Sequence, residues 1–149
     1  MDVIVRPDSR LEDYREAFRY IDYIFPNREE AELLTGRHEL FDMAGVFLDY
    51  GVKNVIIKIG KDGCYVRNQD GADIVPGYMV PDVVDTTGAG DNFAAGFISG
   101  LLQEKSLKEC CRYACGIAGV SIRYQGGCTG VQSRQQAEEE IRRMEEDAK

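Results

Sequence analysis

The chain has 149 residues, of which 18 are Lys or Arg and 26 are Asp or Glu, so its formal net charge is −8. Its length suits one globular domain and argues against a large multidomain enzyme on this chain alone. Because nucleic acids and anionic membranes bind basic surfaces, the acidic balance disfavours both as general partners. No apolar run approaches the roughly 20 residues of a membrane span. The first residues lack the basic start and apolar centre of a signal peptide.

The five cysteines indicate the redox environment in which the protein works. Their odd number and their spacing do not form the framework of a secreted, disulfide-bonded scaffold. They are Cys64, Cys110, Cys111, Cys115 and Cys128. We therefore expect reduced thiols and a cytoplasmic location.

In the first half of the chain, short β-branched runs alternate with amphipathic runs. Strands are predicted at 2–5 and 23–25, and helices over 11–20, 29–34 and 40–48. Gly51 then follows in the place where helices commonly end. The clearest strand is 54–59, whose nearly continuous apolar residues are typical of a strand covered on both faces.

The second half begins with a hairpin signal, because Gly60 to Gly63 turns the chain into a predicted strand at 64–67. The elements expected after it are a turn at 68–71, a strand at 80–84, helices over 91–103 and about 107–122, a loop at 126–130 and a solvated, charged helix over 138–149. This order predicts an α/β domain with a largely parallel sheet.

The most informative segment is the glycine-rich turn Asp85-Thr86-Thr87-Gly88-Ala89-Gly90-Asp91, between a predicted strand and a predicted helix. Its glycines permit a tight bend and close approach of another group. The amides of a first helical turn lack partners in the helix and favour an anion, typically a phosphate. The P-loop pattern is absent, and Phe93 breaks the dinucleotide pattern, which disfavours an oxidoreductase domain. The structural alternative is a helix start with Asp91 as a capping or first-turn acid.

Together with Ala95-Gly96-Phe97-Ile98, this turn resembles the second signature of the ribokinase-like carbohydrate kinases, the PfkB family. Pro26 to Glu30 resembles the Asn-x-x-Glu motif of that family, and Val55 to Gly63 resembles its strand and glycine turn beside the nucleotide. The resemblance implies a three-layer, Rossmann-like α/β fold with a mostly parallel sheet flanked by helices. It also implies an ATP-dependent kinase that transfers the γ-phosphate to a sugar hydroxyl.

The resemblance assigns catalytic roles to the glycine-rich turn. Asp91 matches the catalytic base of the family, and the amides of Gly88, Ala89, Gly90 and Asp91 match its anion hole. A helix start supplies fixed dipoles for such charge stabilisation, and a carboxylate beside the anion is placed for general-base work.

The resemblance also assigns residues to the nucleotide-binding side of the site. Lys58, Gly60 and Gly63 match the nucleotide-side turn, and Cys115 falls near the position that contacts adenine. The alternatives are that the two glycines only form a hairpin turn and that Cys115 is a core residue.

Two cation sites follow from the resemblance. Asn27 and Glu30 match residues that organise Mg²⁺, largely through water; alternatively they are a helix N-cap and its capping-box partner. Asp85 and Thr87, with the loop 126–127, resemble the shell of a monovalent cation, usually K⁺, found in many members.

The length departs from the family, whose members usually have about twice as many residues. We therefore expect 1–149 to be the C-terminal nucleotide-binding and catalytic portion, without the N-terminal sugar-binding and lid portion. The expected partners are ATP and a sugar that the sequence does not identify. A homodimer is left open, because in the family the lid often supplies the dimer contact. Two hypotheses remain: a kinase half that acts when the other half is present, or a nucleotide-binding remnant without kinase activity.

Overall fold

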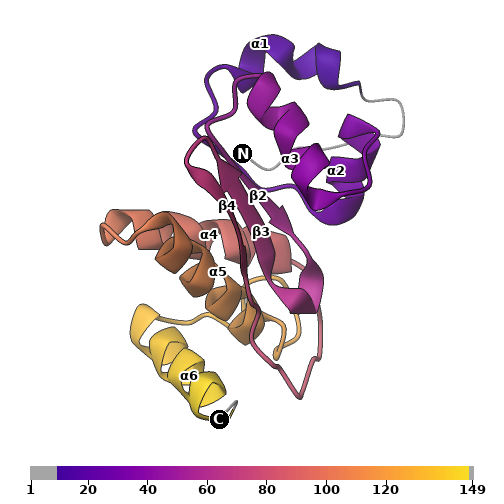
Figure 1. Ribbon diagram of the computed structural model, residues 1–149. Helices are drawn as coiled ribbons and strands as arrows, with labels where there is room; N and C mark the ends of the chain where they lie inside the picture. Colours follow the sequence, from indigo (N-terminus) through magenta and orange to yellow (C-terminus); the bar gives the residue numbers. More distant parts are fainter. Residues whose placement is uncertain (1–9, 148–149) are drawn as a thin grey trace. The chain divides into compact units, whose positions relative to one another are not determined.

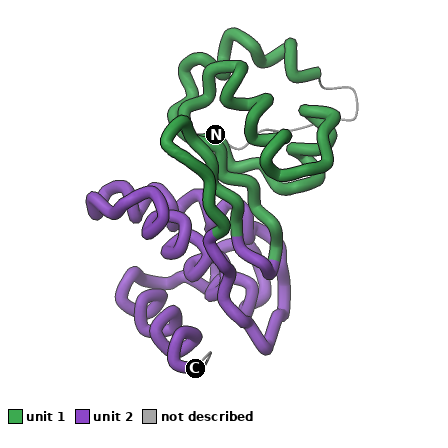
Figure 2. Tube along the Cα trace, in the orientation of Figure 1, with its two compact units in different colours: residues 1–60, 64–74 green, residues 61–63, 75–149 purple. Residues whose placement is uncertain are grey.

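The computed structural model describes residues 10–147 and divides the chain into two compact units (Figure 2). Unit 1 comprises 1–60 and 64–74, and unit 2 comprises 61–63 and 75–149. The strand predicted at 2–5 lies outside the described residues. Each unit is built around its own helices, and the two are described in turn.

Unit 1 holds a sheet and the helices that precede and interrupt it (Figure 1). Its elements are η1 (Leu11–Tyr14), α1 (Arg15–Phe18), β1 (Tyr23–Ile24), α2 (Arg28–Thr35), α3 (Leu40–Asp49), β2 (Asn54–Lys58), β3 (Cys64–Asn68) and β4 (Gly71–Val75). The 3-10 turn η2 (Gly60–Asp62) follows β2 in the chain, and its residues 61–62 belong to unit 2. The helix predicted over 11–20 is therefore a 3-10 turn followed by a short α-helix. The helices predicted over 29–34 and 40–48 are confirmed.

The sheet has the order β1-β2-β3-β4. β1 and β2 are parallel, whereas β2 and β3 are antiparallel, with Ile56 opposite Val66. The predicted α/β class and the hairpin are confirmed. Within the described residues the sheet is mixed, because the turn at Gly60 to Gly63 reverses the chain.

The core of unit 1 lies between the sheet and its helices, where α3 packs on β2 and β3. Phe18, Phe47 and Val55 are fully buried in it. The rings of Phe18 and Phe47 meet edge to face with their centroids 5.9 Å apart. Burial of each large apolar side chain contributes about 1.5–3 kcal/mol, so this cluster is sufficient to hold the short helices on the sheet.

Unit 2 is mainly helical, with α4 (Ala89–Leu102), α5 (Leu107–Ser121) and α6 (Arg134–Asp147). Helices α4 and α5 approach closely because glycines face the contact. A Cβ on Gly96 would lie 3.0 Å from the Ala114 Cα, and one on Gly100 would lie 3.1 Å from the Cys110 Cα. The position of α4 is therefore set by direct contact with the backbone of α5.

The terminal helix α6 begins at Arg134 and is not simply solvated. Ala137, Ile141 and Met144 are buried along one face. That face packs on α5, where a Cβ on Gly116 would lie 2.7 Å from the Ile141 Cδ1. The prediction of a solvated helix is wrong for this face, since the charged composition masked three apolar positions at helical spacing.

The strand predicted at 80–84 is also wrong, because the segment has no strand assignment. The amides of Val84 and Asp85 both donate to the Ile122 carbonyl at the end of α5, at 2.8 and 3.1 Å. A β-branched run forms a strand only where a neighbouring strand offers a ladder. Strand β4, by contrast, was not predicted, because its residues Gly-Ala-Asp-Ile-Val show little apolar alternation.

Within 10–147, no helix is both long enough and apolar enough to cross a membrane. All five cysteines are free thiols; Cys128 is exposed and the other four are buried.

Candidate active site

The glycine-rich turn lies in unit 2 and leads directly into α4. Gly88 precedes the helix with a φ of 73°, a left-handed conformation that favours glycine. A Cβ at this position would lie 2.7 Å from the Gly127 carbonyl oxygen. Only glycine therefore fits where the turn meets the loop 126–127.

The amides at the start of α4 are mostly open. The Asn92 amide donates to the Gly88 carbonyl at 2.9 Å, which is the first bond of the helix, and the Ala89 amide donates to Thr86 at 3.2 Å. In the part of the chain that the structure describes, the amides of Gly88, Gly90 and Asp91 donate to no acceptor. Of the four predicted anion-hole amides, three are thus available at the positive end of the helix dipole.

Asp91 is the third residue of α4, and its side chain is exposed. No side chain caps this helix. Among residues 10–147, none forms a hydrogen bond or ion pair with the Asp91 carboxylate. Asp91 is therefore a first-turn acid that does not cap the helix, and its own amide is one of the three open ones.

Asp85 closes the turn. One of its carboxylate oxygens accepts the Thr87 amide and the other accepts the Gly126 amide, each at 2.9 Å. These backbone donors hold the pKa of Asp85 below its usual value. The structure thus brings Asp85 and Thr87 together with the loop 126–127, as the resemblance implies, although the Asp85 oxygens are engaged by amides.

Asn92 is a site residue that the sequence analysis missed. Its side-chain nitrogen donates to the Gly88 carbonyl at 2.8 Å and to the Gly127 carbonyl at 2.6 Å. Nothing local in the sequence signals this contact, because the second acceptor lies 35 positions further along the chain.

In unit 1, Asn27 and Glu30 form the capping box of α2. The Glu30 amide donates to the Asn27 side-chain oxygen at 2.8 Å, and the Asn27 amide donates to Glu30 Oε2 at 2.7 Å. The structural alternative for this pair is therefore realised. Lys58 lies beside it, since the Lys58 amide donates to the Pro26 carbonyl at 2.9 Å and its backbone is bridged to Asn27.

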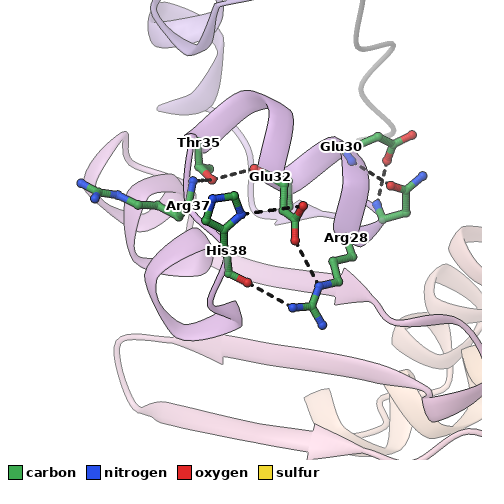
Figure 3. A network of polar contacts seen from close by, with 8 residues as sticks. Arg28, Glu30, Glu32, Thr35, Arg37 and His38 are labelled. Carbon is green, nitrogen blue, oxygen red and sulfur yellow. Dashed lines mark hydrogen bonds and ion pairs between the residues drawn. The ribbon is translucent and has the colours of Figure 1, made fainter.

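The same pair was tested for its fit to Mg²⁺. No group of three or more His, Cys, Asp or Glu residues within the described chain could hold a metal ion. Oε1 of Glu30 makes no hydrogen bond to any described residue. Mg²⁺ keeps several waters and binds through one or two carboxylates, so this oxygen fits a water-rich contact and not a closed protein cage. The neighbouring Arg28 donates to the Glu32 carboxylate and to the His38 carbonyl, both at 3.2 Å (Figure 3).

The remaining predicted nucleotide residues have different surroundings. Gly60 has a φ of 64°, and a Cβ there would meet nothing within 4 Å, so its surroundings are open. Gly63 has a φ of 100°, and a Cβ there would lie 2.1 Å from the Val75 carbonyl oxygen, so a crossing of backbones requires glycine. Cys115 is buried on α5.

Comparison with known proteins places this chain in a family. The model of the pfkB family carbohydrate kinases matches residues 1–134. Ribokinase of Haemophilus influenzae is 36% identical over 126 residues, which cover 81% of this chain and 41% of that protein.

Solved structures agree. Arabidopsis thaliana ribokinase complexed with ribose and ATP has a TM-score of 0.83 at 27% identity, over 94% of this chain and 46% of that one. A putative ribokinase II of E. coli in complex with ATP and Mg²⁺ has a TM-score of 0.82 at 25% identity, over 95% of this chain and 47% of that one. The chain thus spans less than half the length of the relatives it matches. It belongs to the pfkB family of carbohydrate kinases and has the ribokinase-like fold.

Proposed function

We propose that residues 1–149 are the C-terminal nucleotide-binding and catalytic portion of an ATP-dependent carbohydrate kinase, which transfers the γ-phosphate of ATP to a sugar hydroxyl. One observation carries the proposal: α4 begins with open amides, and Asp91, in the same first turn, does not cap the helix. An anion-binding helix start and an adjacent base are the two elements that phosphoryl transfer to an alcohol needs.

In the proposed reaction, Asp91 accepts the proton of the sugar hydroxyl as that oxygen forms a bond to the γ-phosphorus. The bond between this phosphorus and the bridging oxygen of ADP breaks, and ADP leaves. The amides of Gly88, Gly90 and Asp91 stabilise the charge on the moving phosphoryl group. General-base catalysis of this kind is worth roughly 10²–10⁴ in rate.

Cofactor binding is part of the proposal. Lys58, Gly60, Gly63 and Cys115 would line the nucleotide side, and Asn27 and Glu30 would hold Mg²⁺ through water. When bound, Mg²⁺ supplies neutralisation of phosphate charge. The turn of Asp85 and Thr87 and the loop 126–127 would hold K⁺. The ATP and Mg²⁺ in the E. coli neighbour support ATP and Mg²⁺ as the cofactors. The five free thiols support a cytoplasmic location.

The second candidate is a nucleotide-binding remnant without kinase activity of its own. Two observations favour it: the chain matches less than half of its relatives, and one face of α4 is uncovered. Ala95, Ile98 and Leu102 are exposed at helical spacing from Asp91, with Ile98 at 53% and Leu102 at 82%. We expect the part of a pfkB domain that this chain does not match to cover this stripe and to bring the sugar site, the lid and the homodimer contact.

A chimera tests the proposal. The part of Haemophilus influenzae ribokinase that this chain does not match is joined to the chain, and ADP release is measured with and without ribose. Ribose-dependent ADP release is expected, and Asp91→Asn should lower kcat by about 10²–10⁴ while ATP still binds. Asp82→Asn, the same change at an exposed position of unit 2, is the matched control and should leave kcat unchanged.

The outcomes separate the two candidates. Full activity of Asp91→Asn contradicts the catalytic role. ATP binding by the chain without ribose-dependent ADP release by the chimera favours the remnant. Absence of ATP binding contradicts both.

A further inference from the structure

We propose that Asn92 is a positioning residue of the phosphate site: it holds the loop 126–127 against the glycine-rich turn and keeps two carbonyl oxygens turned toward its own side chain. The inference rests on the proposed function, because it assumes that the open amides of α4 receive the phosphates of a nucleotide. It adds a residue that neither the motif nor the comparisons assign.

The first step is the geometry around Gly88. A Cβ at this residue would lie 2.8 Å from the Gly127 Cα, so the turn and the loop touch through their backbones. The Asn92 side chain donates to one carbonyl on each side of this contact, Gly88 at 2.8 Å and Gly127 at 2.6 Å. One side chain therefore joins two segments that are distant in sequence.

The second step is the chemistry of the side chain. A primary amide nitrogen carries two N–H groups, and here each has its own carbonyl acceptor. An ionised aspartate at this position would place oxygens against both carbonyls. An apolar side chain would leave the Gly127 carbonyl without this donor, whereas the Gly88 carbonyl would keep the Asn92 backbone amide. The arrangement thus requires a donor-rich side chain such as asparagine.

The third step is the division of labour with Asp85. Asp85 accepts the N–H of Gly126, whereas Asn92 donates to the C=O of Gly127. Two successive glycines of the loop are therefore fixed by side chains of opposite hydrogen-bonding character. Both side chains come from the turn and the first residues of α4, so the loop is tied to the anion-binding segment at two points.

The last step is electrostatic. A carbonyl oxygen carries partial negative charge and repels a phosphate, whereas an amide N–H attracts it. With the Gly88 and Gly127 carbonyls engaged by Asn92, the amides of Gly88, Gly90 and Asp91 are the backbone groups left for the anion. Asn92 thus acts on the terminal phosphates of the nucleotide without touching them.

The test compares ATP with AMP, both titrated calorimetrically into the chain. Asn92→Ala should weaken ATP binding about tenfold, a loss of the size expected for one or two hydrogen bonds, and Asn92→Asp should weaken it further. AMP lacks the terminal phosphates, so its affinity should not change. Asn68→Ala, which removes an asparagine from the turn between β3 and β4, is the matched control and should alter neither affinity.

Equal weakening of ATP and AMP would assign Asn92 a merely structural role and overturn the inference. If the wild-type chain binds no ATP, that result by itself contradicts the proposed function. The inference about Asn92 is then tested by NMR spectra of the backbone amides in the nucleotide-free protein. In those spectra Asn92→Ala should shift the Gly88, Gly126 and Gly127 resonances and speed their hydrogen exchange. Unchanged resonances would overturn the inference independently.

Discussion

The first turns of α2 in unit 1 and α4 in unit 2 both have backbone N–H groups without a partner inside the helix. At α2 a side chain accepts from them, and at α4 none does. At α2, Asn27 and Glu30 exchange hydrogen bonds with each other's amides in a complete capping box. At α5, Ser106 and Glu109 do the same. At α4 the preceding residue is a glycine, no side chain caps, and the acid at the third position has no partner in the described chain.

Helices α2 and α5 are thus closed at their starts by capping boxes, whereas α3 and α4 begin without a side-chain cap. A glycine at the N-cap in place of Ser, Thr, Asn or Asp costs roughly a few tenths of a kcal/mol of stability. Only at α4 does the sequence replace the cap by a glycine whose backbone touches a second loop. A missing cap alone does not single out α4, because α3 also begins without one and also has an acid in its first turn. What distinguishes α4 is the glycine whose backbone meets the loop 126–127.

The largest effect is expected from closing the space at Gly88. Gly88→Ala adds a Cβ 2.7 Å from the Gly127 oxygen at a φ of 73°. The free energy of unfolding should therefore fall by about 3 kcal/mol, and ATP binding should be lost. Gly60→Ala is the matched control, since it has a similar φ of 64° with nothing within 4 Å. Strain alone should cost it about 1–2 kcal/mol. Equal losses in chemical denaturation would show that the contact with the loop is unimportant.

A smaller effect is expected from opening the two capping boxes. Asn27→Ala and Ser106→Ala should each lower the free energy of unfolding by about 1 kcal/mol, since both remove an N-cap oxygen. If Asn27 also helps to hold Mg²⁺, only its variant should raise the Mg²⁺ concentration needed for half-maximal ATP binding. The same Mg²⁺ dependence in both variants would reduce Asn27 to a cap.

A still smaller effect is expected from pH at the closure of the turn. The pKa of Asp85 is lowered in the folded chain by the Thr87 and Gly126 amides, so its contribution to stability is complete above the unfolded pKa of about 3.9. It is lost as the pH falls through the lower, folded pKa. The stability difference between wild type and Asp85→Asn should therefore be constant near neutral pH and shrink below about pH 4. A difference that does not change with pH would mean that the charge of Asp85 is not what the two amides stabilise.

The smallest effect on the chain itself is expected along the uncovered stripe of α4. Leu102→Glu should change its stability by no more than about 0.5 kcal/mol, because Leu102 is 82% exposed. In the chimera the same change should lower the thermal midpoint, whereas Met79→Glu, at 79% exposure, should not. Tolerance of Leu102→Glu in the chimera would show that the stripe stays uncovered.

The sequence predicted those elements that local pattern determines. Helices α2 and α3 have apolar residues at helical spacing, and β2 is a continuous apolar run. Asn27 and Glu30 were matched to Mg²⁺ residues with a capping pair as the alternative, and the capping box is formed. The equivalent pair Ser106-x-x-Glu109 has the same signature and was not predicted. The glycine turn was predicted because its glycines and acid are contiguous.

What the sequence did not predict depends on distant partners. The segment 80–84 has strand composition but bonds to Ile122 instead of a neighbouring strand. Strand β4 has weak composition but lies beside β3. The joint between turn and loop needs Gly126 and Gly127, which lie far along the chain from Asp85 and Asn92. Propensity carries no information about such contacts.

The glycines of α4 that face α5 have a consequence for how this protein can change over time. Gly96 lies five residues after Asp91, about 7.5 Å along the helix axis, and any side chain there would push against Ala114 and Ile117. A displacement near 1 Å at a reacting group lowers rates by about 10². Under the proposed function, the absence of side chains at Gly96 and Gly100 would thus set the position of the Asp91 carboxylate. Lineages that acquire new acceptors should alter other surfaces and leave this helix contact as it is.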